Sequence, residues 1–347
     1  MSEFSKNNID ELSVFKFLVP DDNDMLSKMS GLDLQDLIIF IEDCYIELRD
    51  RLGLAPQVTF GLELELEHTK KDEIYKQLHK VFPNGEWIVK PDSSLNNGIE
   101  INSPVLTDKT ATWTSLDQVC SIVEPLGFIA ANSGGHIHIG TQVLGDKKEA
   151  WLNFIKLWSV YENIIFRFGY GIYLTARESL LEYAGPIAKD LWKEYEYFNA
   201  NQSSLWEIIM RLTFRRRQAV NFKNVSIEEC DKLKLRNTIE FRCPNGSLDA
   251  AIWQNNVNFF VHMLLYSQSA AFDDDLVEKR HLVNLDRFAE LKLYDEIYLD
   301  QALELGDMLF TNNFDKVYFL KQYLKSLEVW KDRIDYPRSC TLTKKKN

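Results

Sequence analysis

Four short segments of the chain alternate apolar side chains with acidic, histidine or arginine side chains. They are FGLELE from Phe60, GIEI from Gly98, HIHI from His136 and TIEFR from Thr238. Successive side chains of a β-strand point to opposite faces, so each segment predicts one apolar face and one ionisable face. If the four strands lie in one sheet, helices cover its apolar face and its other face becomes a charged basin. We therefore expect an α+β fold.

The ionisable side chains of these segments would share the basin. Its members would be Glu63, Glu65, Glu100, His136, His138, Glu240 and Arg242. Crowded carboxylates disfavour one another's ionisation, and divalent cations relieve that repulsion. Carboxylate oxygens with one or two imidazoles and no thiolate suit Mg²⁺ or Mn²⁺ better than zinc. An arginine beside such cations can bind a transferring phosphoryl group, so the set indicates phosphoryl transfer from a nucleotide.

The remaining periodicity is mostly helical, and no internal repeat or linker divides the chain. Apolar spacing predicts a helix over 31–52 and another over about 147–170. Aromatic residues gather in 151–206, which indicates either a helical core layer or an insertion that covers a ligand. We expect a helical segment over 1–55, a catalytic core over 56–272 with a helical insertion at about 147–213, and C-terminal helices with a basic tail over 273–347.

Composition excludes several classes of protein. The net charge of -12 weighs against a surface built to bind nucleic acid or an anionic membrane. No apolar run approaches the roughly 18 residues of a membrane span, and the N-terminus lacks a secretory signal, so we expect a cytoplasmic protein. The five cysteines are scattered without a CxxC pair, which predicts buried free thiols. Composition does not indicate an oligomeric state.

The chain has no GxxxxGK[ST] loop and no kinase-like glycine loop, so metal ions and side chains would hold the phosphates. In this respect, and in the order of its motifs, the chain resembles the amidoligase family, a branch of the glutamine synthetase and glutamate-cysteine ligase superfamily. The motifs are FGLELE, KPDSSL, GIEINSPVL, SGGHIHIG and NTIEFRCPNGSLDA, between residues 58 and 262.

The resemblance implies roles for individual residues. By it, the expected metal ligands are Glu63, Glu65, Glu100, His136 and Glu240. His138 would lie nearer the nucleotide and Arg242 would contact its phosphates. The family also places an arginine shortly before a VN strand, and here both Arg216 and Arg217 fit that position.

The resemblance also implies a fold and a reaction. The fold is an antiparallel sheet curved around the site, with helices behind it. In the reaction, ATP phosphorylates a carboxylate of a small molecule or peptide, and an amine then displaces the phosphate. An acidic residue should accept the proton of the amine. Glu67 and Asp92 are the candidates, and both also fit a structural role.

Three other functions fit part of the sequence. A zinc hydrolase of the amidohydrolase type needs further histidines downstream, and only His262 and His281 remain, in helix-like contexts. A glycosidase leaves Arg242 and the histidines unexplained. A ligase-like fold without turnover would be a binding or regulatory module, but every expected metal and phosphate position is filled, which favours an enzyme.

Overall fold

The computed structural model describes residues 45–174, 176–213, 217–228, 233, 237–284 and 298–325. Within them, six strands form one sheet in the order β2-β3-β1-β4-β6-β5, and every neighbouring pair is antiparallel. The strands are β1 (Phe60–Leu66), β2 (Ile88–Asp92), β3 (Gly98–Asn102), β4 (Gly135–Gly140), β5 (Val220–Asn221) and β6 (Thr238–Phe241). The α+β class and the antiparallel sheet are thus confirmed.

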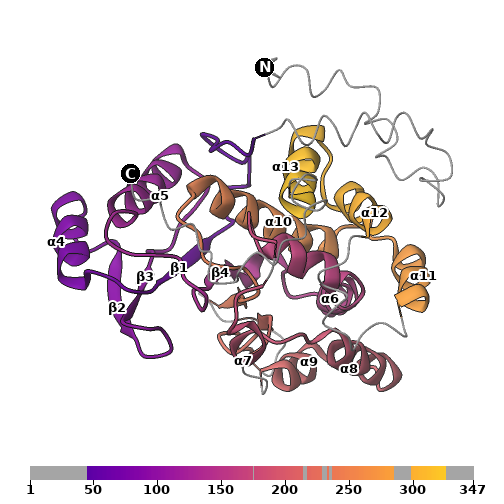
Figure 1. Cartoon of the computed structure of the whole chain (residues 1–347). Helices are drawn as coiled ribbons and strands as arrows, with labels where there is room; N and C mark the ends of the chain where they lie inside the picture. The colour runs from indigo at the N-terminus through magenta and orange to yellow at the C-terminus, as the bar shows by residue number, and fades with distance from the viewer. Residues whose placement is uncertain are drawn as a thin grey trace, which may run out of the picture.

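Helices pack on one face of the sheet, and further helices lie beside it (Figure 1). Between β1 and β5 the helices are α4 (Lys71–Val81), α5 (Thr110–Val123), the 3-10 turn η2 (Thr141–Val143), α6 (Lys148–Gly169), α7 (Leu180–Tyr183), α8 (Ala188–Ala200) and α9 (Leu205–Leu212). After β6 come α10 (Ala250–Gln268), α11 (Asp274–Asn284), α12 (Leu299–Leu309) and α13 (Asn313–Leu324). The predicted helix over about 147–170 is therefore α6, and nearly all of its side chains are buried.

The apolar face of the sheet packs on three of these helices. Phe241 of β6 is fully buried and stacks on Phe260 of α10, with ring centroids 4.2 Å apart, and on Trp158 of α6. On the same face of the sheet, Phe60 of β1 stacks on Trp113 of α5. The apolar residues of the four predicted strands thus lie where the alternation places them.

The segment before β1 corrects one prediction. The predicted helix over 31–52 lies partly outside the described residues, and residues 45–52 are not helical. The carboxylate of Asp108 accepts the backbone N–H groups of Leu52, Gly53 and Leu54, and the Gln254 side chain accepts that of Arg49. Bonds to distant side chains therefore take the place of helical pairing at Arg49 and Leu52.

Two smaller predictions concern thiols and membranes. Cys120 and Cys243 are buried free thiols, as expected, whereas Cys44, Cys230 and Cys340 lie outside the described residues. Among the described helices, none combines the length and the apolar character that crossing a bilayer requires.

The packing of Phe241 generates a stability prediction. Phe241→Ala removes a fully buried ring from the layer between β6, α6 and α10, so we expect the free energy of unfolding to fall by about 3 to 5 kcal/mol. The control is Phe128→Ala, because Phe128 is 41% exposed and should cost far less. Urea denaturation measures both. Equal stabilities of the two variants would contradict the assignment of the apolar face.

Candidate active site

The sheet register brings the predicted basin together on the polar face. Glu63 of β1 pairs with His136 of β4, and Glu65 of β1 pairs with Glu100 of β3. On the other side of β4, His138 pairs with Glu240 of β6. Because these residues all point away from the apolar layer, four strands contribute to one cluster of ionisable groups.

The carboxylate of Glu63 lies between the two imidazoles. One oxygen is 2.9 Å from Nδ1 of His136, and the other is 3.0 Å from Nε2 of His138. Burial raises the pKa of Glu63, but hydrogen bonds from both histidines outweigh it and hold the pKa well below its usual value. Burial lowers the pKa of His138, yet the Glu63 carboxylate more than offsets this and raises it.

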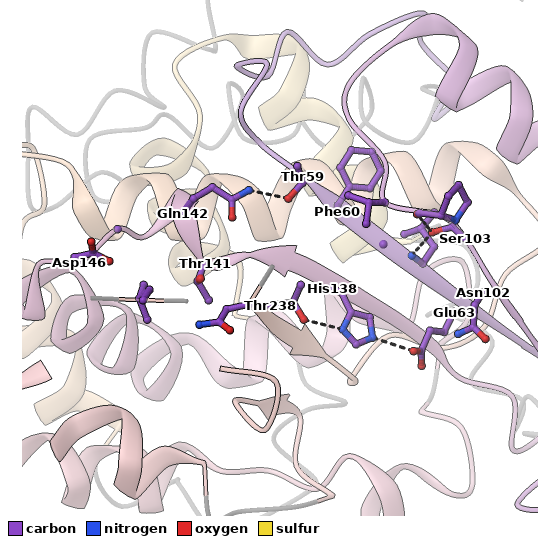
Figure 2. A pocket seen from close by; sticks show the side chains of 17 residues that line it. Thr59, Phe60, Glu63, Asn102, Ser103, His138, Thr141, Gln142, Asp146 and Thr238 are labelled. Atoms are coloured by element: carbon purple, nitrogen blue, oxygen red, sulfur yellow. Dashed lines mark hydrogen bonds and ion pairs between the residues drawn. The ribbon is translucent and has the colours of Figure 1, made fainter. Parts of the chain in front are cut away.

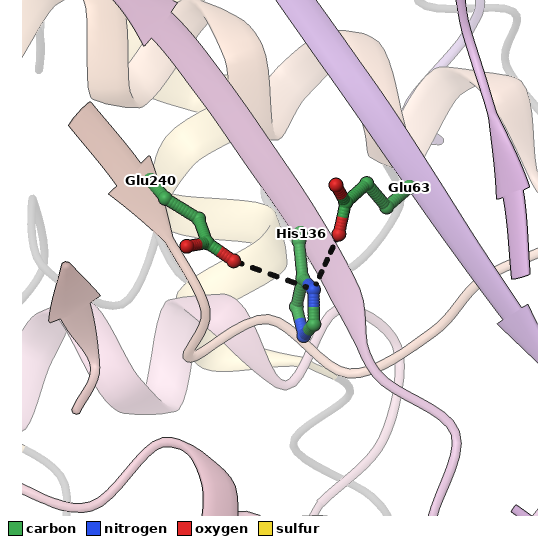
Figure 3. A group of neighbouring side chains, drawn as sticks. All are labelled: Glu63, His136 and Glu240. Atoms are coloured by element: carbon green, nitrogen blue, oxygen red, sulfur yellow. Dashed lines mark hydrogen bonds and ion pairs between the residues drawn. The ribbon is translucent and has the colours of Figure 1, made fainter. Parts of the chain in front are cut away.

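Two groups of side chains have the composition and spacing of cation sites. The first is Glu63, His136 and Glu240 (Figure 3), and the second is Glu65, Asp92 and Glu100. In each group the potential ligand atoms lie within 4.8 Å of one another. Asp92, one of the two candidate bases, thus belongs to a carboxylate cluster. Burial and then the charge of Glu63 raise the pKa of Glu100, as expected where carboxylates crowd.

Glu240 is held at both of its oxygens. Arg242 Nη1 donates to one oxygen at 2.6 Å, and the Asn221 side chain donates to the other at 2.9 Å. Arg242 also donates from Nε to the carbonyl of Tyr183, at the end of α7. These bonds fix the arginine in position. Its side chain also lines a small cavity.

The carboxylates border a small cavity of about 240 Å³, here called the charged cavity. Its lining residues all carry a polar group: Glu63, Glu65, Asp92, Ser94, Glu100, Asn132, His136, Arg177, Ser179, Tyr183 and Arg242. Four carboxylates face two guanidinium groups there, so the metal-free cavity has an excess of negative charge.

Arg177 is a member of this cavity that sequence reasoning missed. Its side chain is buried and donates to the carbonyls of Pro244 and Arg242, while its Nε has no hydrogen-bond partner. It lies in the loop between α6 and α7, where no periodic pattern marks a residue. One signal is available in the sequence. The aromatic-rich segment over 151–206 indicates either a helical core layer or an insertion that covers a ligand, and this loop lies within it.

Gly134 shows how tightly the arginine and the carboxylates pack. Its N–H donates to Glu65 at 2.5 Å. A Cβ at this position would lie 2.8 Å from the Glu65 carboxylate and 2.9 Å from the Arg177 guanidinium carbon. A side chain here would displace both of these side-chain ends, which gives a reason for the first glycine of the SGGHIHIG motif.

A second cavity, the large cavity, has a volume of about 1150 Å³ and adjoins the first. Figure 2 shows Glu63 and His138 at one end of it and Asp146 at the other. Its lining mixes apolar groups such as Phe60 and Val105 with amides and hydroxyls. Glu63 lines both cavities and therefore stands between them.

The structure places Arg217 and Glu67 outside the linings of both cavities. Arg216 falls outside the described residues. Arg217 is exposed and lies over the ring of Tyr183, 5.4 Å from its centroid, at the rim of the charged cavity rather than in its lining. Glu67, the other candidate base, is buried and accepts the N–H of Asn96 at 2.7 Å, which fits the structural role.

The Glu63 contacts generate a titration prediction. Glu63→Gln removes the charge that raises the His138 pKa, so that pKa should fall toward or below the ordinary 6.5. In the parent, protonated His138 stabilises the fold below about pH 6.5, and this contribution disappears as the pH rises through the raised pKa. NMR titration of the imidazole protons measures the shift. His281 on α11 is the internal reference, and unchanged titration of His138 would contradict the contact.

The chain matches one family model, and it is similar to solved structures. No curated protein matches it. Among solved structures, a crystal structure of a "novel glutamine synthase homolog" is similar at 11% identity with a TM-score of 0.41, covering 88% of this chain and 72% of that one. Residues 83–264 match the family model described as "Putative amidoligase enzyme". This match covers more than half of the chain and includes β3, β4 and β6, so the protein belongs to the amidoligase family.

Proposed function

We propose that the protein is an ATP-dependent ligase that joins a carboxylate to an amine through an acyl phosphate. The observation that carries the proposal is the position of Glu63. It stands between a charged cavity and a large cavity, beside two groups of potential cation ligands. Two adjoining cavities beside potential cation ligands allow a phosphoryl group to pass directly between two bound substrates.

The large cavity is the proposed nucleotide site. Its volume suits a nucleotide, and its mixed lining offers both apolar contact for a base and polar groups for a sugar. His138 and Glu63 lie at one end (Figure 2), so the phosphates would point there and the base toward Asp146. This agrees with the role that the family resemblance implies for His138.

The two carboxylate groups are the proposed sites for Mg²⁺ or Mn²⁺. Both offer carboxylate oxygens with at most one imidazole, and the first group includes Glu63, at the expected phosphate position. Nε2 of buried His136 makes no hydrogen bond and lies 3.3 Å from the carboxylate of Glu65, a member of the second group. Bound cations would supply charge neutralisation and Lewis acidity.

The arginines hold the acid and the transferred group. Arg177 and Arg242 both line the charged cavity, and they come from two different segments of the chain. Arg177 lines the charged cavity, so a substrate carboxylate there can form an ion pair with its guanidinium group. Arg242 lies beside Glu240 and can bind the phosphoryl oxygens as charge develops.

The reaction conserves atoms in two steps. A carboxylate oxygen of the acid attacks the γ-phosphorus of ATP, and the bond to the bridging oxygen breaks to release ADP. The amine nitrogen then attacks the acyl carbon, its proton passes to a base, and inorganic phosphate leaves. Phosphorylation is required because a carboxylate has no adequate leaving group. The polar lining supports a small-molecule or peptide acid over an apolar one.

The test is a turnover screen with Mg²⁺ or Mn²⁺, ATP and pooled amino acids, with hydroxylamine as the amine. We expect ADP, inorganic phosphate and a hydroxamate detected by mass spectrometry, and no product after chelation of the cations. Release of AMP and pyrophosphate would show an adenylating enzyme instead. ATP binding by calorimetry without turnover of any pool would indicate a binding or regulatory module.

Arg242 gives a second test of the mechanism. Arg242→Lys keeps the charge but loses the planar pair of donors, so turnover should fall about 100-fold to 1000-fold, equal to about 3 to 4 kcal/mol. ATP affinity should change much less. Arg211→Lys is the matched control, since Arg211 is an exposed arginine on α9 paired with Glu194. Parental turnover in Arg242→Lys would exclude Arg242 from phosphoryl binding.

A further inference from the structure

The C-terminal end of α6 is bonded by donors from distant parts of the chain. The last carbonyls of a helix have no partner inside the helix and need donors from elsewhere. Here Lys325 Nζ donates to the Arg167 carbonyl at 2.9 Å and to the Gly171 carbonyl. The Gln322 side chain donates to Phe168, also at 2.9 Å. The C-terminal helices therefore contact the site-bearing part of the chain through defined bonds.

Lys325 is buried and follows α13 directly. Its third bond goes to the Gln322 carbonyl at 2.5 Å, so three carbonyls match the three N–H donors of an ammonium group. Burial, and then the charge of Arg167, lower the pKa of Lys325 well below its usual value. A cation at a helix C-terminus is also favoured by the helix dipole.

The backbone at both ends of this contact is unusual. Lys325 has a φ of 67°, which is uncommon for a residue with a side chain, and Gly171 has a φ of 63°. At Gly171 the chain leaves α6 and enters the loop toward α7. The ammonium group thus binds the carbonyl at the turn that sets the direction of this loop.

Asn245 connects the same helix end to Arg177. Its backbone N–H donates to the Gly169 carbonyl at 2.9 Å, and its side-chain amide donates to Tyr170 at 3.3 Å. Its side-chain oxygen accepts the backbone N–H of Arg177 at 3.0 Å. The end of α6 and the Arg177 backbone are therefore positioned relative to one another, and Lys325 secures that end from the opposite side.

We propose that Lys325 is a positioning residue for Arg177, acting through the end of α6. This inference rests on the proposed role of Arg177 as the ligand of the acid substrate. Through Lys325, α13 (Figure 1) would help to order the site, although this helix lies outside the residues that match the family. Acid binding, rather than nucleotide binding, is the step that depends on Lys325.

The matched control lies on the same helix. Lys316 is also buried, and its Nζ binds Asp307 at 2.6 Å, within the pair formed by α12 and α13. Lys316→Met removes a buried ammonium group without touching the end of α6. Comparison of Lys325→Met with Lys316→Met separates a specific effect on the loop from general destabilisation of the C-terminal helices.

Hydrogen exchange of the full chain measures the loop without any substrate. The backbone N–H groups of Tyr173, Arg177 and Glu178 are hydrogen-bonded and report on it. In Lys325→Met their exchange should accelerate about 10-fold to 100-fold, the factor that loss of a charge-assisted hydrogen bond produces. In Lys316→Met it should match the parent. If Lys325→Met does not fold, Gln322→Met provides the same test from the neighbouring donor.

Kinetics measure the consequence for the acid. In the hydroxamate assay with pooled amino acids, Lys325→Met should raise the half-saturating pool concentration about 10-fold and leave the KM for ATP unchanged. Unchanged exchange in the loop, equal acceleration in both lysine variants, or an equal effect on ATP and acid would each overturn the inference. Failure of the parent to form any hydroxamate would overturn the proposed function, and the exchange result would still decide whether Lys325 orders the loop.

Discussion

One layer of close-packed apolar side chains beneath the sheet positions the ionisable side chains that the strands carry on the other face. Aromatic stacking of Phe241 on α6 and α10 fixes β6, and stacking of Phe60 on α5 fixes β1. Because a strand's two faces alternate, fixing the buried face also fixes where Glu63 and Glu240 point. A slip of one residue would move these carboxylates into the core, so the packing of the core and the geometry of the site are one constraint.

Much of the basin followed from alternation alone. Glu63, His136 and Glu240 lie together as their strands predict, and the strands predicted near them all exist. The pattern within each strand does not predict which strands pair or in which register they pair. The register that makes Glu63 the neighbour of both imidazoles depends on contacts among segments more than 70 residues apart along the chain.

Two features of the structure did not follow from the sequence pattern. Arg177 lies on a loop, and its place is set by carbonyls of Pro244 and Arg242 rather than by any local preference. The segment over 45–52 has helical spacing of apolar residues, yet Gln254 and Asp108 accept the N–H groups of Arg49 and Leu52, and the segment is not helical. In both cases, a distant hydrogen-bond partner decided the local structure.

The position of Glu63 between the two cavities has a consequence for the order of events. Without cations, an incoming acid meets four carboxylates and only two guanidinium groups, so like charges repel it from the charged cavity. A polyanion bound in the large cavity with its counter-cations would change the electrostatic potential in the adjoining charged cavity. If both substrates bind as proposed, filling one compartment lowers the barrier to filling the other, and the empty molecule is closed to acids by electrostatics without any moving lid.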